Sequence, residues 1–472
     1  MHNILGNKSI LWNKYSSLGF LLLLMQLTLS ASSNFILANF GVSITKGITS
    51  ALYYIISLSL YVGLLILAEL PASFSKLNFD RAVYEVQKAY ITQFNQTHKN
   101  QVILNAETTF KDTQEAWLMV RSGSIIQASL SIFYNLTSLG LGVILNISAI
   151  SIAGDIRLII GYIISFIIMY FATKYFKKEL TILIEKSHYN KTLLAVTLQS
   201  GWDNIVIGNE YNQNNWWKTC MERLENARQA SFRELYKQNF SELVIRFLIT
   251  LPIFIGTSIL IMVNINNPIH LAPLLVTLPI QMRLIPEICA VATYINFWNK
   301  MSLEIDLLLK SLSAPREKIT ELDNRPTNRI KWNLIYFTFD NKNLTFNSVA
   351  QITDYLSTIR HGRLCIRGPN QSGKTTISNL LKQQLPDAIY IPTNSKLYFK
   401  STFEIPVSTG QKTLNQLKEL FLLVSQYNQP KIIILDEWDA NLDSTTLLKL
   451  SNFINQLSKK HKIIEIRHRQ DG

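Results

Sequence analysis

The chain has 472 residues, of which 48% are hydrophobic and only 17% are charged. A soluble globular domain carries about 25% charged residues, so this composition argues against an all-soluble protein and favours one that lies in a bilayer. The formal net charge is +14. The basic residues flank apolar runs and form no compact tail or aromatic-interleaved patch, so we expect no nucleic-acid partner. Cys220, Cys289 and Cys365 are far apart and match no metal-ligand spacing, so no disulfide framework is expected.

Six apolar segments precede residue 300, and each is close to the ~20 residues that a helix needs to cross a hydrocarbon core. The segments are Leu18–Phe40, Ile48–Leu70, Ile125–Asn146, Ile156–Tyr175, Leu243–Val263 and Leu271–Trp298. The first has an alternative interpretation as a signal peptide, because Lys8 and Lys14 precede it and small residues follow at Ser30–Ser33. The apolar character continues to Phe40 and a second segment follows at once, which favours six membrane helices.

The loops between these segments differ in length and charge. Those after the first, third and fifth segments are short, with Lys46 as their basic residue, whereas Pro71–Ser124 and Phe176–Glu242 are long and rich in Lys and Arg. The positive-inside rule therefore predicts a cytoplasmic N-terminus, cytoplasmic long loops and a cytoplasmic C-terminal region. Both long loops contain many good helix formers and almost no Pro, so we expect helical extensions of the membrane helices.

After Trp298 the chain becomes polar, and Pro315 and Pro326 with mixed charges are typical of a linker. From Lys331 on, short β-rich runs alternate with helical stretches, as in an α/β domain. The predicted strands are Leu334–Phe339, Leu364–Arg367, Ile389–Pro392, Ile432–Leu435 and Ile463–Ile466. The sequence thus predicts a membrane α-helical bundle at residues 1–310, a linker at 311–330 and an α/β domain at 331–472.

The strongest motif is Gly368–Thr375, which matches G-x-x-x-x-G-K-[ST] between the strand Leu364–Arg367 and a predicted helix over Thr376–Gln384. In such a P-loop the backbone N–H groups point at phosphate oxygens, Lys374 places a positive charge at the β- and γ-phosphates, and the Thr375 hydroxyl reaches Mg²⁺. An accidental Gly/Lys turn is the alternative, which the strand-and-helix setting disfavours. The residues expected around the nucleotide phosphates are Gly368, Pro369, Asn370, Gln371, Ser372, Gly373, Lys374, Thr375 and Thr376.

A second motif is the apolar run Ile432–Leu435 followed by Asp436 and Glu437. The acidic pair lies at the carboxyl end of a predicted buried strand, where ligands bind in such sheets. Asp436 can hold Mg²⁺ through water, and Glu437 can polarise the water that attacks the γ-phosphate. An apolar strand that ends in Asp-Glu is common by itself, and its place downstream of a P-loop favours the functional interpretation.

These motifs resemble the nucleotide-binding domain of ABC transporters, and the resemblance extends through the C-terminal domain. The family's signature Ser-Gly-Gly-Gln-Arg corresponds to Ser408-Thr409-Gly410-Gln411-Lys412. Its acidic strand and following loop correspond to Leu435–Asp443, and its switch histidine to His468. Six helices with two long inner loops likewise resemble the exporter-type membrane domain, so the resemblance implies a half-transporter.

The resemblance implies that two such domains enclose two ATP molecules with Mg²⁺. Ser408, Gly410 and Gln411 of one chain would then bind the ATP held by the other chain's P-loop. His468 would contact the γ-phosphate as a catalytic residue beside Glu437, and Phe339 would stack on adenine, although a strand aromatic is more often part of a core. The partners expected are a second half-transporter, as homodimer or heterodimer, the lipid bilayer of a bacterial inner membrane, and a small-molecule, lipid or peptide substrate.

Several departures from the family pattern favour an alternative, a degenerate ABC protein that binds ATP without pumping. Lys374 and Asp436 are only 62 residues apart, Thr393 stands where the family has glutamine, and the sequence ends four residues after His468. A third alternative, a soluble P-loop enzyme with a membrane anchor, would need one or two spans. In the sixth segment Arg283 and Glu287 either line a transport path or form a satisfied ion pair.

Overall fold

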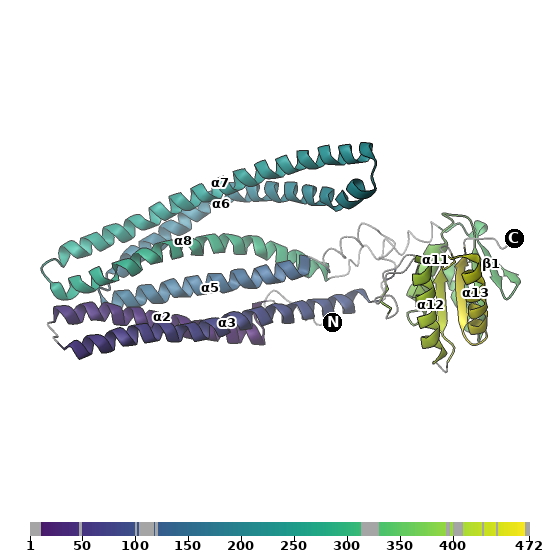
Figure 1. The fold of residues 1–472 in the computed structure, drawn as a ribbon, viewed down its shortest axis with the longest axis horizontal. Helices are drawn as coiled ribbons and strands as arrows, with labels where there is room; N and C mark the ends of the chain where they lie inside the picture. Colours follow the sequence, from purple (N-terminus) through teal and green to yellow (C-terminus); the bar gives the residue numbers. More distant parts are fainter. Residues whose placement is uncertain are drawn as a thin grey trace. The chain divides into compact units, whose positions relative to one another are not determined.

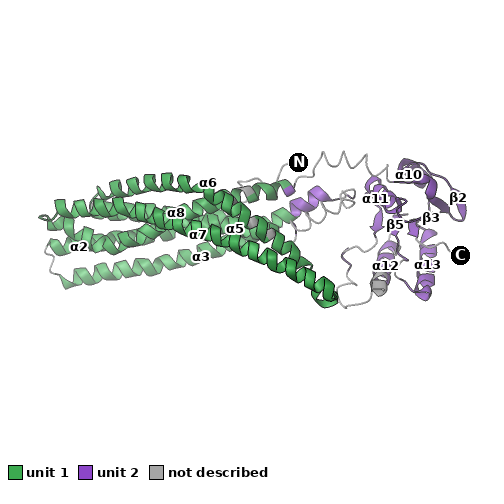
Figure 2. Cartoon of the chain, turned by 90° about the horizontal axis from the view of Figure 1, so that it is seen from above, with its two compact units in different colours: residues 1–91, 120–310 green, residues 92–119, 311–472 purple. Residues whose placement is uncertain are grey.

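The computed structural model describes residues 11–46, 50–99, 102, 118, 121–312, 330–392, 397–399, 409–426, 429–439 and 442–467. At 409–413 it describes the backbone alone. The chain divides into two compact units, residues 1–91 with 120–310 and residues 92–119 with 311–472 (Figure 2). Each unit is considered by itself below. The predicted linker at 311–330 lies outside the described residues except at 311, 312 and 330, and Ser311 is the last residue of α8.

The described part of the first unit consists mainly of long helices (Figure 1). They are α2 (Lys14–Thr45), α3 (Ala51–His98), α5 (Ser122–Ala153), α6 (Leu158–Gln199), α7 (Glu210–Val263) and α8 (Pro268–Ser311). Six helices among the described residues are long and apolar enough to cross a membrane. Each contains most of one predicted apolar segment, so the six predicted spans are confirmed and the protein is a multi-pass membrane protein.

Side-chain packing in these helices follows the rules for a lipid environment. Large apolar side chains such as Leu52 and Ile55 are more than half exposed, because lipid tails solvate them as well as a protein core does. Polar side chains instead join helices inside the bundle. Asn34 Nδ2 of α2 donates to Asn146 Oδ1 of α5 at 2.6 Å, and Ser165 Oγ of α6 donates to the Ile249 carbonyl of α7 at 2.8 Å. The first segment is therefore a packed part of the bundle.

The described parts of the two long loops are largely helical, as the sequence predicts. α3 continues to His98, α6 to Gln199, and α7 begins at Glu210, well outside the apolar segments. Between α6 and α7 the chain forms a π-helical turn at Asp203–Ile207, and the Asn209 side chain caps α7 by accepting from Asn212 N at 3.0 Å. Trp216 Nε1 donates to the Thr197 carbonyl at 2.9 Å, so this tryptophan holds the α6–α7 hairpin together.

The second unit contains a six-stranded sheet with strand order β2-β1-β3-β6-β5-β4. The strands are β1 (Tyr336–Phe339), β2 (Lys342–Leu344), β3 (Gly362–Arg367), β4 (Ile389–Ile391), β5 (Ile432–Asp436) and β6 (Lys462–Arg467). β3, β6, β5 and β4 are parallel, while β1 pairs antiparallel with β2 and β3. Four helices accompany the sheet: α10 (Val349–Thr358), α11 (Lys374–Gln384), α12 (Thr409–Ser425) and α13 (Ser444–Ser458).

The two faces of this sheet are covered by different helices because successive strand residues point to opposite sides. Ile434 of β5 belongs to one apolar cluster with residues of α10 and α11, and its neighbours Ile433 and Leu435 belong to another with residues of α12 and α13. The membrane bundle and this α/β unit together confirm the predicted fold class. The sequence-based interpretation missed β2 and α10.

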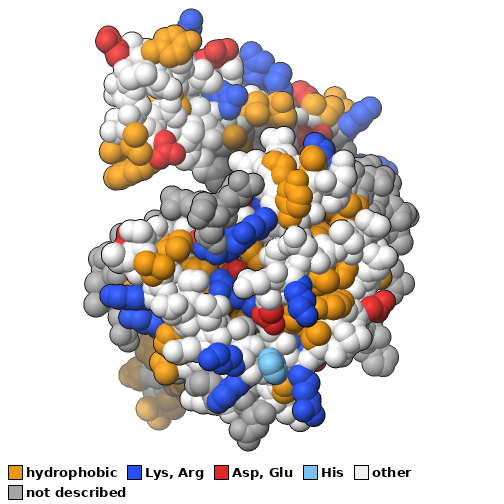
Figure 3. All heavy atoms as spheres, turned by 90° about the vertical axis from the view of Figure 1, so that its right-hand side faces the viewer, with side chains coloured by type: hydrophobic (Ala, Val, Ile, Leu, Met, Phe, Trp, Pro, Cys, Tyr) orange, Lys and Arg blue, Asp and Glu red, His pale blue; other side chains and the backbone are white. Residues whose placement is uncertain are grey.

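Charged side chains are dispersed over the face shown in Figure 3. Lysine and arginine lie among hydrophobic, acidic and uncharged atoms there rather than in one continuous stripe. The basic excess of the sequence is therefore spread over this view of the surface.

Candidate nucleotide-binding site

The carboxyl ends of parallel strands bring the two predicted motifs to one edge of the sheet. Residues 368–373 follow β3, Glu437 follows β5, and both strands pair with β6, which lies between them. In the register Arg367 lies opposite Arg467 and Asp436 opposite Ile466. A P-loop and an acidic pair that are far apart in the sequence thus lie on neighbouring positions of one edge.

The P-loop has a backbone that few sequences tolerate. Gln371 has φ +61° and Gly373 has φ +96°, and left-handed conformations favour glycine because it has no Cβ. A Cβ at Gly368 would lie 2.9 Å from the Leu334 carbonyl and 3.0 Å from Ser372 Oγ. Gly373 is also the N-cap of α11, so the loop leads directly into a helix N-terminus, which favours anions.

Lys374 is the first residue of α11, and its side chain folds back over the loop. Its Nζ donates to the Gly368 carbonyl at 2.8 Å and to the Pro369 carbonyl at 3.0 Å. The residue is only 5% exposed. An ammonium group held this close to backbone N–H groups gives the loop the charge that a phosphate chain requires.

Asp436 is brought against α11 by the packing of β5 on that helix. The Thr375 and Ser378 side chains lie close to the Asp436 carboxylate and lower its pKa. The Tyr390 hydroxyl of β4 lies 3.2 Å from Asp436 Oδ2 and 3.0 Å from Asn379 Oδ1. The two residues predicted as Mg²⁺ ligands, Thr375 and Asp436, therefore lie beside each other.

Burial dominates the electrostatics of Asp436. Desolvation, with a smaller contribution from the charge of Glu437, raises the pKa of Asp436 to about 6, although hydrogen bonds from Tyr390, Thr375 and Ser378 act in the opposite direction. A buried carboxylate of this kind gains from a neighbouring divalent cation. One carboxylate and one hydroxyl are also a typical protein share of a Mg²⁺ shell completed by phosphate and water. The residues present thus fit a Mg²⁺–nucleotide complex.

Glu437 directly follows the strand and has an unusual backbone. Its φ is +47°, which costs roughly 1–2 kcal/mol for a residue other than glycine, and its N–H donates to the Ile466 carbonyl at 3.0 Å. Such strain persists only where the surroundings impose it, and it is frequent at functional sites. Glu437 is half-buried next to Asp436, which is the place that a water-polarising carboxylate would need.

A buried ionic network joins β3 and β6 to the residues that follow Glu437. Arg363 of β3 makes two hydrogen bonds to Glu465 of β6, at 2.9 and 2.8 Å, and Trp438 Nε1 donates to the same carboxylate at 3.2 Å. Beside it, Arg467 Nε donates to Asp439 Oδ2 at 3.3 Å. This network fixes the residues that follow Glu437, and the sequence analysis did not single it out.

Phe339 is not among the residues gathered around the P-loop. It pairs with Leu364, three residues before the end of β3, and its ring packs on Gly362 and edge-on against Tyr355. This position assigns it to the core, so its predicted stacking on adenine has no support here. Tyr336, at the other end of β1, lies opposite Arg367 next to the loop and is 64% exposed.

Several predicted residues cannot be placed. Ser408, His468 and Thr393 lie outside the described residues, and for Gly410 and Gln411 the structure describes the backbone of α12 alone. Conversely, the site contains Ser378, Asn379 and Tyr390, which sequence reasoning missed. Ser378 and Asn379 lie one turn beyond Lys374 on the same helix, and that spacing was a usable signal.

Six membrane-competent helices followed by this α/β unit define the fold of an exporter-type ABC half-transporter. The comparison with solved structures agrees. The chain is similar to a bacterial Atm1-family ABC exporter whose structure has ATP bound, with 12% sequence identity, a TM-score of 0.66 and coverage of 96% of this chain and 92% of that one. No protein-family model and no curated protein sequence matches the chain.

Proposed function

We propose that this protein is an ATP-driven half-transporter, active as a dimer with a second half-transporter in a bacterial inner membrane. The observation that carries the proposal is the placement of Thr375 beside the buried Asp436, at the end of a P-loop that also holds Lys374. The relative in the comparison was solved with ATP bound, which supports ATP as the nucleotide. The orientation, with the α/β unit cytoplasmic, rests on the charge of the two long loops.

The residues divide the work as follows. Backbone N–H groups of Gln371–Lys374 would bind phosphate oxygens, and Lys374 would neutralise their charge. Thr375 and Asp436 would hold Mg²⁺, which when bound draws charge from the phosphate oxygens. Glu437 would orient and polarise the attacking water. Signature residues Ser408, Gly410 and Gln411 of the second chain, together with His468, would complete each site, and binding and hydrolysis would drive the membrane helices between two arrangements.

The test measures ATP binding and turnover of the full-length protein in lipid nanodiscs. Lys374→Ala removes a charge-assisted contact to phosphate worth about 1.5–3 kcal/mol, so ATP affinity should fall ~10- to 100-fold. Glu437→Gln should retain ATP affinity while turnover falls ~100-fold or more. Lys342→Ala, an exposed lysine of β2, is the matched control and should behave as the native chain.

The same titration distinguishes the two candidate aromatics. Tyr336→Ala should weaken ATP binding by about 1 kcal/mol or more, because a base loses its stacking partner, whereas Phe339→Ala should leave binding unchanged in protein that remains folded. Absence of Mg²⁺-dependent ATP affinity in the native chain would refute the proposal. Native binding with turnover no faster than that of Glu437→Gln would favour the degenerate, non-pumping alternative.

A further inference from the structure

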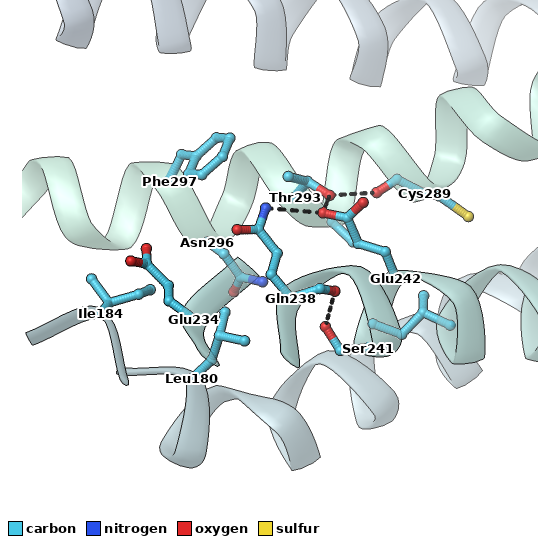
Figure 4. A pocket seen from close by; sticks show the side chains of 12 residues that line it. Leu180, Ile184, Glu234, Gln238, Ser241, Glu242, Cys289, Thr293, Asn296 and Phe297 are labelled. Carbon is cyan, nitrogen blue, oxygen red and sulfur yellow. Dashed lines mark hydrogen bonds between the residues drawn. The ribbon is translucent and has the colours of Figure 1, made fainter. Parts of the chain in front are cut away.

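A pocket in the membrane unit is lined by side chains of α6, α7 and α8 (Figure 4). It is small, with a volume of about 60 Å³, which holds a few water molecules or one end of a ligand, whereas pockets that enclose a whole small molecule are about 300–1,000 Å³. Its lining residues are at the ends of the apolar segments on the side of the long loops, from Leu180 of α6 to Phe297 of α8. The pocket therefore lies near the level where these helices leave the bilayer.

Two carboxylates face this pocket, and none of its lining residues is basic, although Arg246 lies beside the lining residue Cys289. Glu242 Oε1 accepts from Gln238 Nε2 at 3.1 Å and from Thr293 Oγ1 at 3.4 Å, as Figure 4 shows. Its Oε2 accepts no hydrogen bond from the described residues. Glu234 has its ion-pair partner Lys191 Nζ at the long distance of 3.9 Å. The pocket thus presents acceptor oxygens that the surrounding protein has not used.

The other residues that line the pocket indicate which kind of ligand it could bind. The Asn296 side chain lines the pocket and makes no hydrogen bond with the described residues, while Leu180, Ile184 and Phe297 provide apolar walls. Two carboxylates between such apolar walls supply too few oxygen ligands for a bare divalent cation. They suit a group with N–H donors and a positive charge on an apolar body, because charge-assisted hydrogen bonds to carboxylates are the strong ones.

We propose that this pocket binds the ammonium end of an amphipathic organic amine, with Glu242 as the principal counter-ion and Glu234 and Asn296 as further contacts. Its role as the entry site for a transport substrate rests on the proposed function, but the binding itself does not. The pocket thereby assigns a substrate class to the transporter, namely organic cations with an apolar portion. The ATP-binding region by itself gives no indication of the substrate.

The experiment uses a matched pair of fluorescent probes, dansylcadaverine and its N-acetyl derivative, which differ in the charge of one nitrogen. Binding to the full-length protein in phosphatidylcholine nanodiscs, without nucleotide, is followed by fluorescence anisotropy. The native protein should bind the amine at least tenfold more tightly than the acetylated probe. Glu242→Gln should abolish this preference, and Ala292→Phe, which fills the pocket without changing charge, should weaken binding of both probes.

Glu225→Gln is the control, because Glu225 lies on the same helix but is exposed and paired with Arg228 at 2.6 Å. It should keep the native preference, and circular dichroism should show equal helicity in all variants. Equal affinity for the two probes, or a preference that survives Glu242→Gln, would overturn the proposal. Since the assay contains no ATP, a protein that fails to hydrolyse ATP but keeps the amine preference would contradict the proposed function alone.

Discussion

At the end of β5 the carboxyl group of Asp436 is 1% exposed, and burial raises its pKa to about 6. The fold therefore places a carboxylate where its charge is disfavoured until a cation arrives. Its partners Thr375, Ser378 and Tyr390 come from α11 and β4. Such an unfavourable burial of a charged carboxylate is common at sites that bind a metal–nucleotide complex, because binding of the cation offsets it.

The raised pKa of Asp436 predicts how the stability of the folded protein depends on pH. Because the folded pKa lies above the unfolded value, the folded state retains a proton that the unfolded chain releases as pH rises from about 4 to about 6. Asp436→Asn should therefore stabilise the nucleotide-free protein at pH 7.5 by about 3 kcal/mol, and the gain should vanish below pH 4. At pH 7.5 the readout is thermal exposure of Cys365 to a thiol dye in a Cys220→Ser, Cys289→Ser background, which leaves one cysteine. At low pH, where too little thiolate is present to react, the readout is thermal unfolding followed by tryptophan fluorescence.

Asp443 is the control, because its replacement by Asn should change stability at pH 7.5 in the opposite direction. Hydrogen bonds from Thr445 and Thr446 lower the pKa of this N-cap residue of α13 to about 2. Asp443→Asn should thus destabilise the protein at pH 7.5, and its difference from the native chain should shrink as pH falls towards 2. An Asp436→Asn variant no more stable than the native chain at pH 7.5 would contradict the argument.

At the scale of elements, one ion pair joins the middle of the sheet. Arg363 of β3 and Glu465 of β6 are 2.8 Å apart, with side chains 15% and 2% exposed. The two partners are therefore not equivalent, because Arg363 can regain water when its partner is lost and Glu465 cannot. Breaking a buried pair by removing one partner costs about 3–5 kcal/mol when the remaining charge stays buried.

We expect Arg363→Met to destabilise the α/β unit by about 3 kcal/mol. Glu465→Gln should cost less, since its amide oxygen still accepts from Trp438 and Arg363 gains hydration. The Cys365 labelling assay measures both, and the double variant should be milder than Arg363→Met because no uncompensated carboxylate remains. Equal costs for the two single variants would show that the asymmetric burial has no energetic effect.

Some helices and strands of the α/β unit could be predicted from the sequence pattern and others could not. The strands flanking the P-loop and Asp436 were predicted because they are apolar runs bounded by turn residues. α10 was missed although Val349, Ile352 and Leu356 have helical spacing and Ser348 caps it by accepting from Gln351 N. β2 was missed for a different reason, because three residues stabilised by pairing with β1 carry no periodic signal of their own.

At the scale of the whole molecule, a single chain supplies half of each proposed ATP site. Mixing two inactive variants tests this. Lys374→Ala disables the P-loop and Gly410→Asp the signature, so each alone should lack turnover. Co-reconstituted in equal amounts, they should recover about a quarter of native activity, because half of the dimers contain one intact site of two.

The control for this mixture is Lys374→Ala combined with a chain that carries both substitutions, which cannot form an intact site and should stay inactive. No recovery in the first mixture, despite dimers seen by crosslinking, would contradict shared sites. Full activity of the Gly410→Asp chain alone would do the same, because a self-sufficient P-loop needs no second chain.

The sequence by itself determined the membrane spans, the helical character of the long loops, the P-loop motif and the acidic pair. Each depends on local composition or on spacing within one element, such as an apolar run long enough to cross a bilayer. Only the tertiary structure decided that Thr375 lies beside Asp436, that Phe339 packs against the core, and that Glu234, Glu242 and Asn296 from two helices face one pocket. These features arise from strand register and helix packing, which join residues far apart in the chain and leave no mark in any single segment.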